Sequence, residues 1–192
     1  MTLCFATNNT HKIKEIQALL GNSHQLLSLR DIGCTEELAE DQETLEGNSL
    51  QKAEYVFQHY KVACFADDTG LEVEALKGAP GVYSARYAGD QRQPADNMQL
   101  LLKNLQGEKN LKARFRTVIT LITTKGTRQF EGILNGTITF EQRGTQGFGY
   151  DPVFVPEGYE QTLAELSLDE KNKISHRARA VQKLVLFLKA AR

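Results

Sequence analysis

Two adjacent carboxylates, Asp67 and Asp68, come directly after the apolar run Val62 to Ala66. In open α/β sheets, ligands collect beyond the carboxyl ends of the strands. Neighbouring carboxylates at such a place are costly unless something neutralises them. Mg²⁺ is the natural partner, because it takes oxygen ligands and bridges to phosphates. The pattern indicates a site that holds Mg²⁺ and phosphate. The alternative is an exposed turn rich in Asp and Gly, which would end at Gly70.

A polar stretch near the N-terminus separates the apolar run Thr2 to Ala6 from a helical pattern that Gly21 ends. Backbone N–H groups at the start of a helix attract anions, and the helix dipole adds to this attraction. We therefore predict a grip on phosphate, although the stretch lacks the spacing of a Walker loop. Its members are Thr7, Asn8, Asn9, Thr10, His11 and Lys12. The alternative is ordinary capping of the helix by Asn9 or Thr10.

Two aromatic residues alternate with glycines in the segment Gly147 to Pro152. Phe148 and Tyr150 beside Gly149 would form a flat platform on which a purine could stack, with Asp151 accepting from a ring N–H group. The alternative is a structural turn whose aromatic rings pack on the core.

Basic residues mark the last part of the chain, at Lys171 and in the sequence Ser175-His176-Arg177. They could donate to the oxo groups of a base or to a phosphate. Basic residues at the start of a helix oppose its dipole, which hints at a nearby anion or acceptor. A capped, cationic helix start is the alternative.

The elements that must position these groups alternate between strand and helix patterns. We predict strands at 2–6, 26–29, 62–66, 71–75 and 115–123, and a hairpin of 129–134 and 137–140 about an Asn135-Gly136 turn. We predict helices at 13–20, from Asn48 or Ser49 to Tyr60, at 94–105 and at 178–188. Ser167 with Glu170 fits a capping box at the start of a further helix. Strand–helix units together with a hairpin predict an α/β fold with a mixed sheet.

Charge and composition exclude several other classes of protein. The 23 Lys+Arg nearly balance the 24 Asp+Glu, so a broad surface for nucleic acid is not expected. No apolar run is long enough to span a membrane, and the N-terminus lacks the pattern of a signal peptide. The three cysteines, Cys4, Cys34 and Cys64, form no C-x-x-C motif. We therefore expect a cytoplasmic protein with no membrane or nucleic-acid partner.

Taken in order, these motifs resemble those of the inosine triphosphate pyrophosphatase family, the house-cleaning purine nucleoside triphosphatases. The matching pieces are Thr7-x-Asn9-x-x-Lys12, Ala66-Asp67-Asp68-Thr69-Gly70-Leu71, the stretch Gly78 to Tyr87, Phe148-Gly149-Tyr150-Asp151-Pro152 and Ser175-His176-Arg177. The motifs are spread over nearly the whole chain, so the resemblance covers essentially all of it. We therefore predict a single domain, 1–192.

The resemblance implies a two-lobed mixed sheet flanked by helices, with a cleft between the lobes. It also implies a homodimer and Mg²⁺-dependent hydrolysis of ITP, dITP and XTP to the monophosphate plus pyrophosphate. Asp68 would be the catalytic carboxylate at the metal and Thr69 would touch the substrate. Residues 7–12 and Lys52 would hold the phosphates. The base pocket would comprise Phe148, Gly149, Tyr150, Asp151, Lys171, His176 and Arg177.

One region departs from the family's pattern. At the second helix, the family usually has a Glu, then Gly, Thr and Phe, and then the sequence Glu-Asn-Ala. In this chain, Gly47 occupies the position of the Glu in Glu-Asn-Ala. Most of the acidic side chains from Glu36 to Glu46 are expected to be solvated. We favour Glu40 as the second metal ligand, with Glu43 as the rival.

Two other functions are compatible with the same motifs. One is a pyrophosphatase for pyrimidine or modified nucleotides, which would need a differently lined pocket. The other is a sensor that binds a purine nucleotide without cleaving it.

Overall fold

The computed structural model describes residues 2–21 and 25–190. Its elements in chain order are β1 (Thr2–Phe5), α1 (Thr10–Leu20), β2 (Gln25–Leu27), α2 (Leu45–Tyr60), β3 (Cys64–Val73), the 3₁₀ turns η1 (Glu74–Leu76) and η2 (Gly81–Arg86), α3 (Pro94–Asn104), β4 (Lys112–Thr123), β5 (Gly126–Ile138), η3 (Asp151–Val153), β6 (Phe154–Pro156), α4 (Leu168–Ile174) and α5 (His176–Ala190).

The strands form one mixed sheet in the order β2-β1-β3-β4-β5-β6. Strand β1 pairs in parallel with β2 and β3, whereas β6 is antiparallel to β5. The predicted α/β fold with a mixed sheet and flanking helices is confirmed. The cleft between two lobes and the single domain of 1–192 stay predictions.

The chain divides into two compact units. Unit 1 comprises Met1–Asp68, Thr117–Gly132 and Arg177–Arg192, and unit 2 comprises Thr69–Arg116 and Ile133–His176. Asp68 is therefore the last residue of the first stretch of unit 1.

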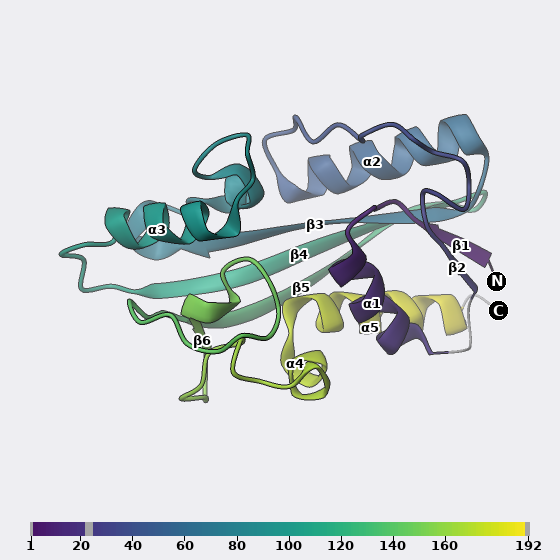
Figure 1. Ribbon diagram of the computed structural model, residues 1–192. Coiled ribbons are helices and arrows are strands. Elements are labelled where there is room, and N and C mark those ends of the chain that lie inside the picture. The colour runs from purple at the N-terminus through teal and green to yellow at the C-terminus, as the bar shows by residue number, and fades with distance from the viewer. Residues whose placement is uncertain (1, 22–24, 191–192) are drawn as a thin grey trace. The chain divides into compact units, whose positions relative to one another are not determined.

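In unit 1, β1 and the start of β3 are buried on both faces, as expected for central strands with parallel pairing. Alternate residues of β1 and the residue after it enter two different core clusters. Leu3 and Phe5 pack with α1 and α5, whereas Cys4 and the following Ala6 pack with α2. Figure 1 shows α1 and α5 on one side of these strands and α2 on the other. Phe5 stacks on Phe65 of β3 with the ring centroids 4.7 Å apart.

Unit 2 has a core of its own, in which helix α3 packs with residues from the second half of β3 and the first half of β4. Its members are Leu71, Val73, Met98, Leu101, Leu105, Ala113, Phe115, Leu134, Ile138, Tyr150, Val153, Phe154, Leu163 and Leu166. The aromatic loop after β5 contributes Tyr150 to this core, so one of the two predicted platform residues is a packing residue.

Strand β3 differs from the prediction, because it continues through the two aspartates instead of ending before them. It runs without a break from Cys64 to Val73. Gly70 is not in a turn: a Cβ at this position would lie 2.5 Å from the carbonyl oxygen of Gly81. Glycine therefore permits the close approach of another segment to the strand.

The predicted Asn135-Gly136 hairpin is wrong. β5 runs from Gly126 to Ile138, and the turn that joins it to β4 lies at residues 124–125. Gly136 instead pairs with Pro156 of β6, and a Cβ there would lie 2.3 Å from the carbonyl oxygen of Val155. The glycine that resembled a turn signal allows two strands to approach closely.

The ends of three helices test the capping predictions. Asn9 caps α1, and the box of Ser167 with Glu170 at α4 is confirmed. Helix α2 starts earlier than predicted, because the side chain of Thr44, not Asn48 or Ser49, accepts from the N–H group of Gly47. Asn48 and Ser49 are buried inside the helix as a result.

The three cysteines are buried and carry no disulfide in the described part of the chain. Burial raises the pKa of both the Cys4 and the Cys64 thiol to about 12, so these thiols stay protonated at neutral pH. Both are core residues. Between residues 2–21 and 25–190, no helix has the length and apolar character needed to cross a membrane.

Candidate active site

Asp67 lies at the centre of a buried cluster of charges in unit 1. Only 1% of its surface is exposed. Lys12 Nζ donates to its Oδ1 at 3.0 Å, and Arg177 Nε donates to its Oδ2 at 3.3 Å. Burial alone would raise the pKa of Asp67, but the cations Lys12, Arg177 and Lys52 outweigh burial and hold this pKa well below its ordinary value. Asp67 is therefore ionised and anchors the basic side chains around it.

Asp68 points to the other face of β3 and has a different environment. Its side chain is buried, and Asn48 Nδ2 donates to its Oδ2 at 3.0 Å. Burial raises the pKa of Asp68, and the like charge of Glu40 adds to the rise, while Lys52 and Lys12 oppose it. A carboxylate held in this way is suited to accept a proton.

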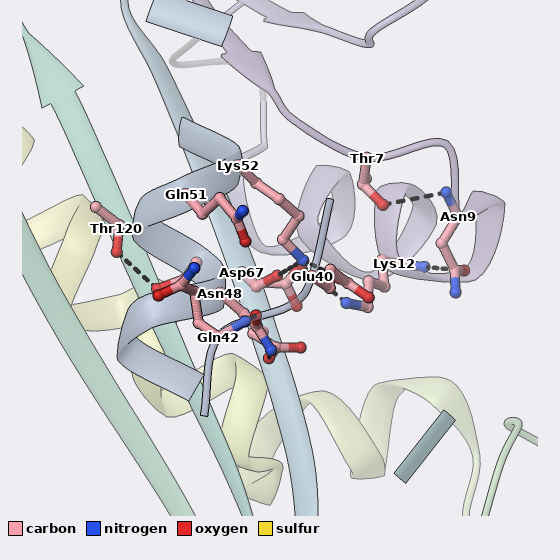
Figure 2. A network of polar contacts seen from close by, with 12 residues as sticks. Thr7, Asn9, Lys12, Glu40, Gln42, Asn48, Gln51, Lys52, Asp67 and Thr120 are labelled. Carbon is pink, nitrogen blue, oxygen red and sulfur yellow. Dashed lines mark hydrogen bonds and ion pairs between the residues drawn. The ribbon is translucent and has the colours of Figure 1, made fainter. Parts of the chain in front are cut away.

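Glu40 and Lys52 form an ion pair beside Asp67 (Figure 2). Lys52 is buried, and its Nζ also donates to the backbone oxygen of Asp67 at 2.7 Å. The Glu40 side chain keeps 27% of its surface exposed. Burial alone would raise the pKa of Glu40, but Lys52 outweighs burial and lowers it. Both residues thus stay charged within one cluster.

The stretch from residue 7 to residue 12 places Lys12 in this cluster. Asn9 Oδ1 accepts from the backbone N–H groups of His11 at 3.0 Å and Lys12 at 3.2 Å. Thr7 Oγ1 accepts from the N–H group of Asn9 at 3.1 Å. Of the two capping residues that the sequence left open, Asn9 and Thr10, Asn9 is therefore the cap. Asn8, Thr10 and His11 are exposed at this helix start, and their predicted contact with phosphate stays a prediction.

The structure separates the predicted base-pocket residues between the two units. Arg177 belongs to unit 1, where its guanidinium faces Asp67. The other members belong to unit 2, and so does Thr69. These are Phe148, Gly149, Tyr150, Asp151, Lys171 and His176.

Within unit 2, Asp151 and Lys171 form a buried ion pair of 2.9 Å. The same carboxylate oxygen, Oδ2, accepts from the backbone N–H group of Phe148 at 2.9 Å. A Cβ on Gly147 would lie 2.1 Å from this oxygen, so glycine is required at that position. Lys171 Nζ lies 4.9 Å from the centroid of the Phe148 ring. A half-buried ring of the loop and a buried ammonium group of α4 thus lie side by side.

His176 is also buried in unit 2, where it stacks on Phe115. The ring centroids are 4.7 Å apart and the planes differ by 14°. The aromatic neighbour fixes the plane of the imidazole, so the ring edge is the part that remains for polar contacts.

Tyr150 has a positioning contact that the sequence did not indicate. Its hydroxyl donates to the backbone oxygen of Ser84 at 2.7 Å. The Ser84 hydroxyl in turn accepts from the N–H group of Leu71 at 2.9 Å and donates to the Gly81 oxygen at 2.6 Å. The stretch Gly78 to Tyr87 is therefore tied both to β3, just after the aspartates, and to the aromatic loop.

We expect Tyr150→Phe to lower the free energy of unfolding by about 1–3 kcal/mol, because the oxygen of Ser84 loses its buried donor. Chemical denaturation monitored by circular dichroism measures this change. Tyr159→Phe is the control, since Tyr159 is 40% exposed, and it should change stability by no more than about 0.5 kcal/mol. Equal effects of the two substitutions would show that the Ser84 contact carries no stability.

Sequence reasoning missed the roles of Asn48 and Ser84. Asn48 carries a recognisable signal, since it lies four residues before Lys52 and so shares its helix face. Ser84 carries no such signal, because its partners lie on β3 and in the aromatic loop.

Comparisons with known proteins find relatives along nearly the whole chain. The model of the Ham1 family matches residues 3–187. The chain is 54% identical over 192 residues to a dITP/XTP pyrophosphatase of Flavobacterium johnsoniae, covering 100% of both chains. It is 45% identical over 189 residues to a dITP/XTP pyrophosphatase of Bacillus subtilis, covering 96% of each chain.

Solved structures give the same result. The Ham1 protein of Staphylococcus aureus matches with a TM-score of 0.92 at 33% identity, covering 100% of both chains. A nucleoside-triphosphatase described as a dITP/XTP pyrophosphatase, from Mycobacterium abscessus, matches with a TM-score of 0.79 at 39% identity. That match covers 96% of this chain and 99% of the other. The fold is thus that of solved Ham1 proteins. This chain belongs to the Ham1 family.

Proposed function

We propose that this protein hydrolyses non-standard purine nucleoside triphosphates, namely ITP, dITP and XTP, to the monophosphate plus pyrophosphate. The observation that carries the proposal is the buried cluster in unit 1, where Lys12 and Lys52 lie among three carboxylates (Figure 2). Two ammonium groups suit a phosphate chain, and a carboxylate with a raised pKa suits activation of water. The names of the similar proteins, dITP/XTP pyrophosphatases, support the same substrates.

Mg²⁺ fits the oxygen donors of this cluster. Across residues 2–21 and 25–190, no group of three or more His, Cys, Asp or Glu side chains converges on a common point that could hold a metal ion. Mg²⁺ does not need such a cage, since it is usually held by one or two carboxylates together with substrate phosphates and water. Asp68 and Glu40 are the carboxylates that would hold it. When bound, the ion would neutralise charge on the phosphates.

The side chains of the cluster have separate roles in the proposed hydrolysis. Asp68 positions a water molecule and accepts its proton as the water attacks the α-phosphorus. Lys12 and Lys52 stabilise the charge that moves to the leaving pyrophosphate. An ammonium group has three donors, so Lys12 can donate to a phosphate while it stays paired with Asp67. Asp67 keeps Lys12 in place for this purpose.

The buried pair of Lys171 and Asp151 supports selection of the base. The oxo group at position 6 of hypoxanthine or xanthine accepts from Lys171, and the ring N–H group donates toward Asp151, while the base stacks on Phe148. Adenine presents an amino group at position 6, which leaves a donor facing a donor. Unpaired buried polar groups can lower the rate by orders of magnitude.

Glu40→Gln and Glu43→Gln distinguish the two candidate metal acids. Glu40 lies in the cluster with Lys52, whereas Glu43 is exposed. We expect Glu40→Gln to raise the Mg²⁺ concentration for half-maximal XTP turnover by about 10- to 100-fold. Glu43→Gln should leave it within twofold of the wild-type value. The reverse order would assign the metal to Glu43.

The function itself is tested by incubating the protein with XTP, dITP, ITP, GTP, ATP and CTP, with Mg²⁺ or with a chelator. Chromatography identifies the products. We expect monophosphate and pyrophosphate from the first three nucleotides only, and only with Mg²⁺. Tight binding of ITP without pyrophosphate release would favour a sensor, and preferential cleavage of CTP would favour a pyrimidine enzyme. Equal rates on ITP and GTP would contradict the proposed selectivity.

We also propose a homodimer, as the resemblance implies, and a cytoplasmic location. Light scattering of the purified protein is expected to give twice the mass of one chain. A mass equal to one chain at micromolar concentration would contradict the dimer.

A further inference from the structure

The buried amide of Asn48 joins the two segments that carry the candidate metal ligands. Its Nδ2 group donates to Asp68 Oδ2 at 3.0 Å, and its Oδ1 accepts from the backbone N–H group of Gln42 at 2.9 Å. Only 1% of Asn48 is exposed. A carboxamide is suited to this position, because it carries one donor for the carboxylate and one acceptor for the backbone. Figure 2 shows Asn48 beside Gln42, with Glu40 and Asp67 close by.

Lys52 makes a second connection between the same two segments. It follows Asn48 by one turn of α2, so the two side chains share a face of the helix. Lys52 pairs with Glu40 and donates to the backbone oxygen of Asp67. The face of α2 thus acts as a spacer between the segment that carries Glu40 and the strand that carries Asp68.

Gly47 lets the acidic segment lie against the start of α2. A Cβ at this position would lie 2.8 Å from the Cβ of Gln42, which is closer than real Cβ atoms approach. The segment is held there by Gln51, whose Nε2 donates to Asp41 Oδ1 at 2.7 Å and whose Oε1 accepts from Asp41 N at 3.3 Å. The short distance from Gln42 to Asn48 therefore depends on the absence of a side chain at Gly47.

We propose that Asn48 is a positioning residue that sets the separation between the carboxylate of Asp68 and the segment of Glu40, so that one divalent cation can be held by both acids. The inference rests on the proposed function for the identity of the cation and deepens it. A partner that orients a ligand in this way typically contributes 10- to 100-fold to metal affinity.

The test compares Asn48→Ala with Ser49→Ala. Ser49 is the matched control, because it is equally buried on α2 but has other partners. Its hydroxyl bonds to that of Thr120 at 2.7 Å and to the backbone oxygen of Glu46. The first readout is binding of Mn²⁺ alone, followed by electron paramagnetic resonance. The second is the Mg²⁺ concentration at half-maximal XTP turnover, and the third is the thermal unfolding midpoint.

We expect Asn48→Ala to weaken Mn²⁺ binding and to raise the Mg²⁺ requirement, each by about 10- to 100-fold. Excess Mg²⁺ should restore part of the turnover. Ser49→Ala should lower the unfolding midpoint without changing either metal value by more than twofold. Wild-type Mn²⁺ affinity in a folded Asn48→Ala protein would overturn the inference, and so would equal loss of affinity in both variants.

A second pair of variants applies if Asn48→Ala does not fold. Gly47→Ala keeps Asn48 but adds a Cβ that clashes with the Cβ of Gln42. The substitution should displace Gln42 from Asn48 and so weaken Mn²⁺ binding. The double variant Gln42→Gly/Gly47→Ala should recover affinity, because the clashing Cβ is gone. Wild-type affinity in Gly47→Ala would overturn the inference.

The failure of the inference is distinguishable from failure of the proposed function. A wild-type protein that binds Mn²⁺ but releases no pyrophosphate from XTP contradicts the function and leaves the Mn²⁺ comparison valid. Normal XTP hydrolysis with unchanged Mn²⁺ binding in Asn48→Ala contradicts only the inference.

Discussion

Asp68→Asn is expected to lower the rate of XTP hydrolysis by about 10²- to 10⁴-fold, because an amide cannot accept the proton of the attacking water. The substitution keeps the size of the side chain, and its oxygen can still accept from Asn48. Pyrophosphate release under saturating XTP and Mg²⁺ measures the effect.

Folding should not suffer from this substitution. Burial and the charge of Glu40 raise the pKa of Asp68, so its ionised form is disfavoured in the folded state. A neutral amide removes this cost, and the unfolding midpoint in metal-free buffer should be at least that of the wild type. Asp90→Asn, at an exposed position, is the control and should keep wild-type turnover. Turnover of Asp68→Asn within tenfold of the wild-type rate would remove Asp68 from the proposed chemistry.

Asp67→Ala is expected to lower the free energy of unfolding at pH 7 by about 3–5 kcal/mol, because removing one partner of a buried ion pair leaves uncompensated charge. Lys12 and Arg177 would both lose their carboxylate, with side-chain exposures of 15% and 2%. Urea denaturation monitored by circular dichroism measures the change.

The pH dependence gives a second check on Asp67. Its pKa is lower in the folded state than in the unfolded state, so its contribution is present above the ordinary Asp pKa of about 3.9 and is lost as the pH falls through the folded value. The stability difference between wild type and Asp67→Ala should therefore be complete at pH 7 and shrink below about pH 4.

Arg114→Ala is the matched control for a charge that is not buried. Arg114 pairs with Glu72 at 2.6 Å but keeps 48% of its side chain exposed. An exposed pair contributes about 0–1 kcal/mol, so this variant should unfold close to the wild type. If Asp67→Ala cost no more than Arg114→Ala, the buried cluster would not contribute to stability as the geometry indicates.

The adjacent aspartates have different partners because strand residues alternate between two faces. The sequence presents Asp67 and Asp68 as an equivalent pair, and both residues were candidates for the metal centre. On β3, Asp67 faces Lys12 and Arg177, whereas Asp68 faces Asn48. Only the neighbours from other elements distinguish the carboxylate that anchors Lys12 and Arg177 from the one proposed to accept a proton.

Two turn signals illustrate where local reading of the sequence fails. Gly70 and Gly136 both stand beside residues typical of turns, yet each lies inside a long strand. In both cases another backbone segment approaches where a Cβ would be, and that segment is distant in sequence. A glycine can be required because the backbone has a positive φ or because another segment lies where a Cβ would be. The sequence does not distinguish these two reasons.

The start of α2 shows a similar limit. Asn48 is a good capping residue by type, but Thr44 is another, and the helix begins at the earlier one. Once Thr44 caps the helix, Asn48 lies within it, and its amide is available for Gln42 and Asp68.

By itself, the sequence determined the class of fold, the order of the motifs and the residue types that could hold phosphate, metal and base, because these depend on local periodicity and on side-chain chemistry. It also limited the cap of α1 to Asn9 or Thr10, since a cap and its partners are three residues apart or fewer. The tertiary structure alone decided which charges are neutralised by which partners. Lys12 and Asp67 are separated by 55 residues and Arg177 and Asp67 by 110, and the pKa of a buried carboxylate depends on such neighbours.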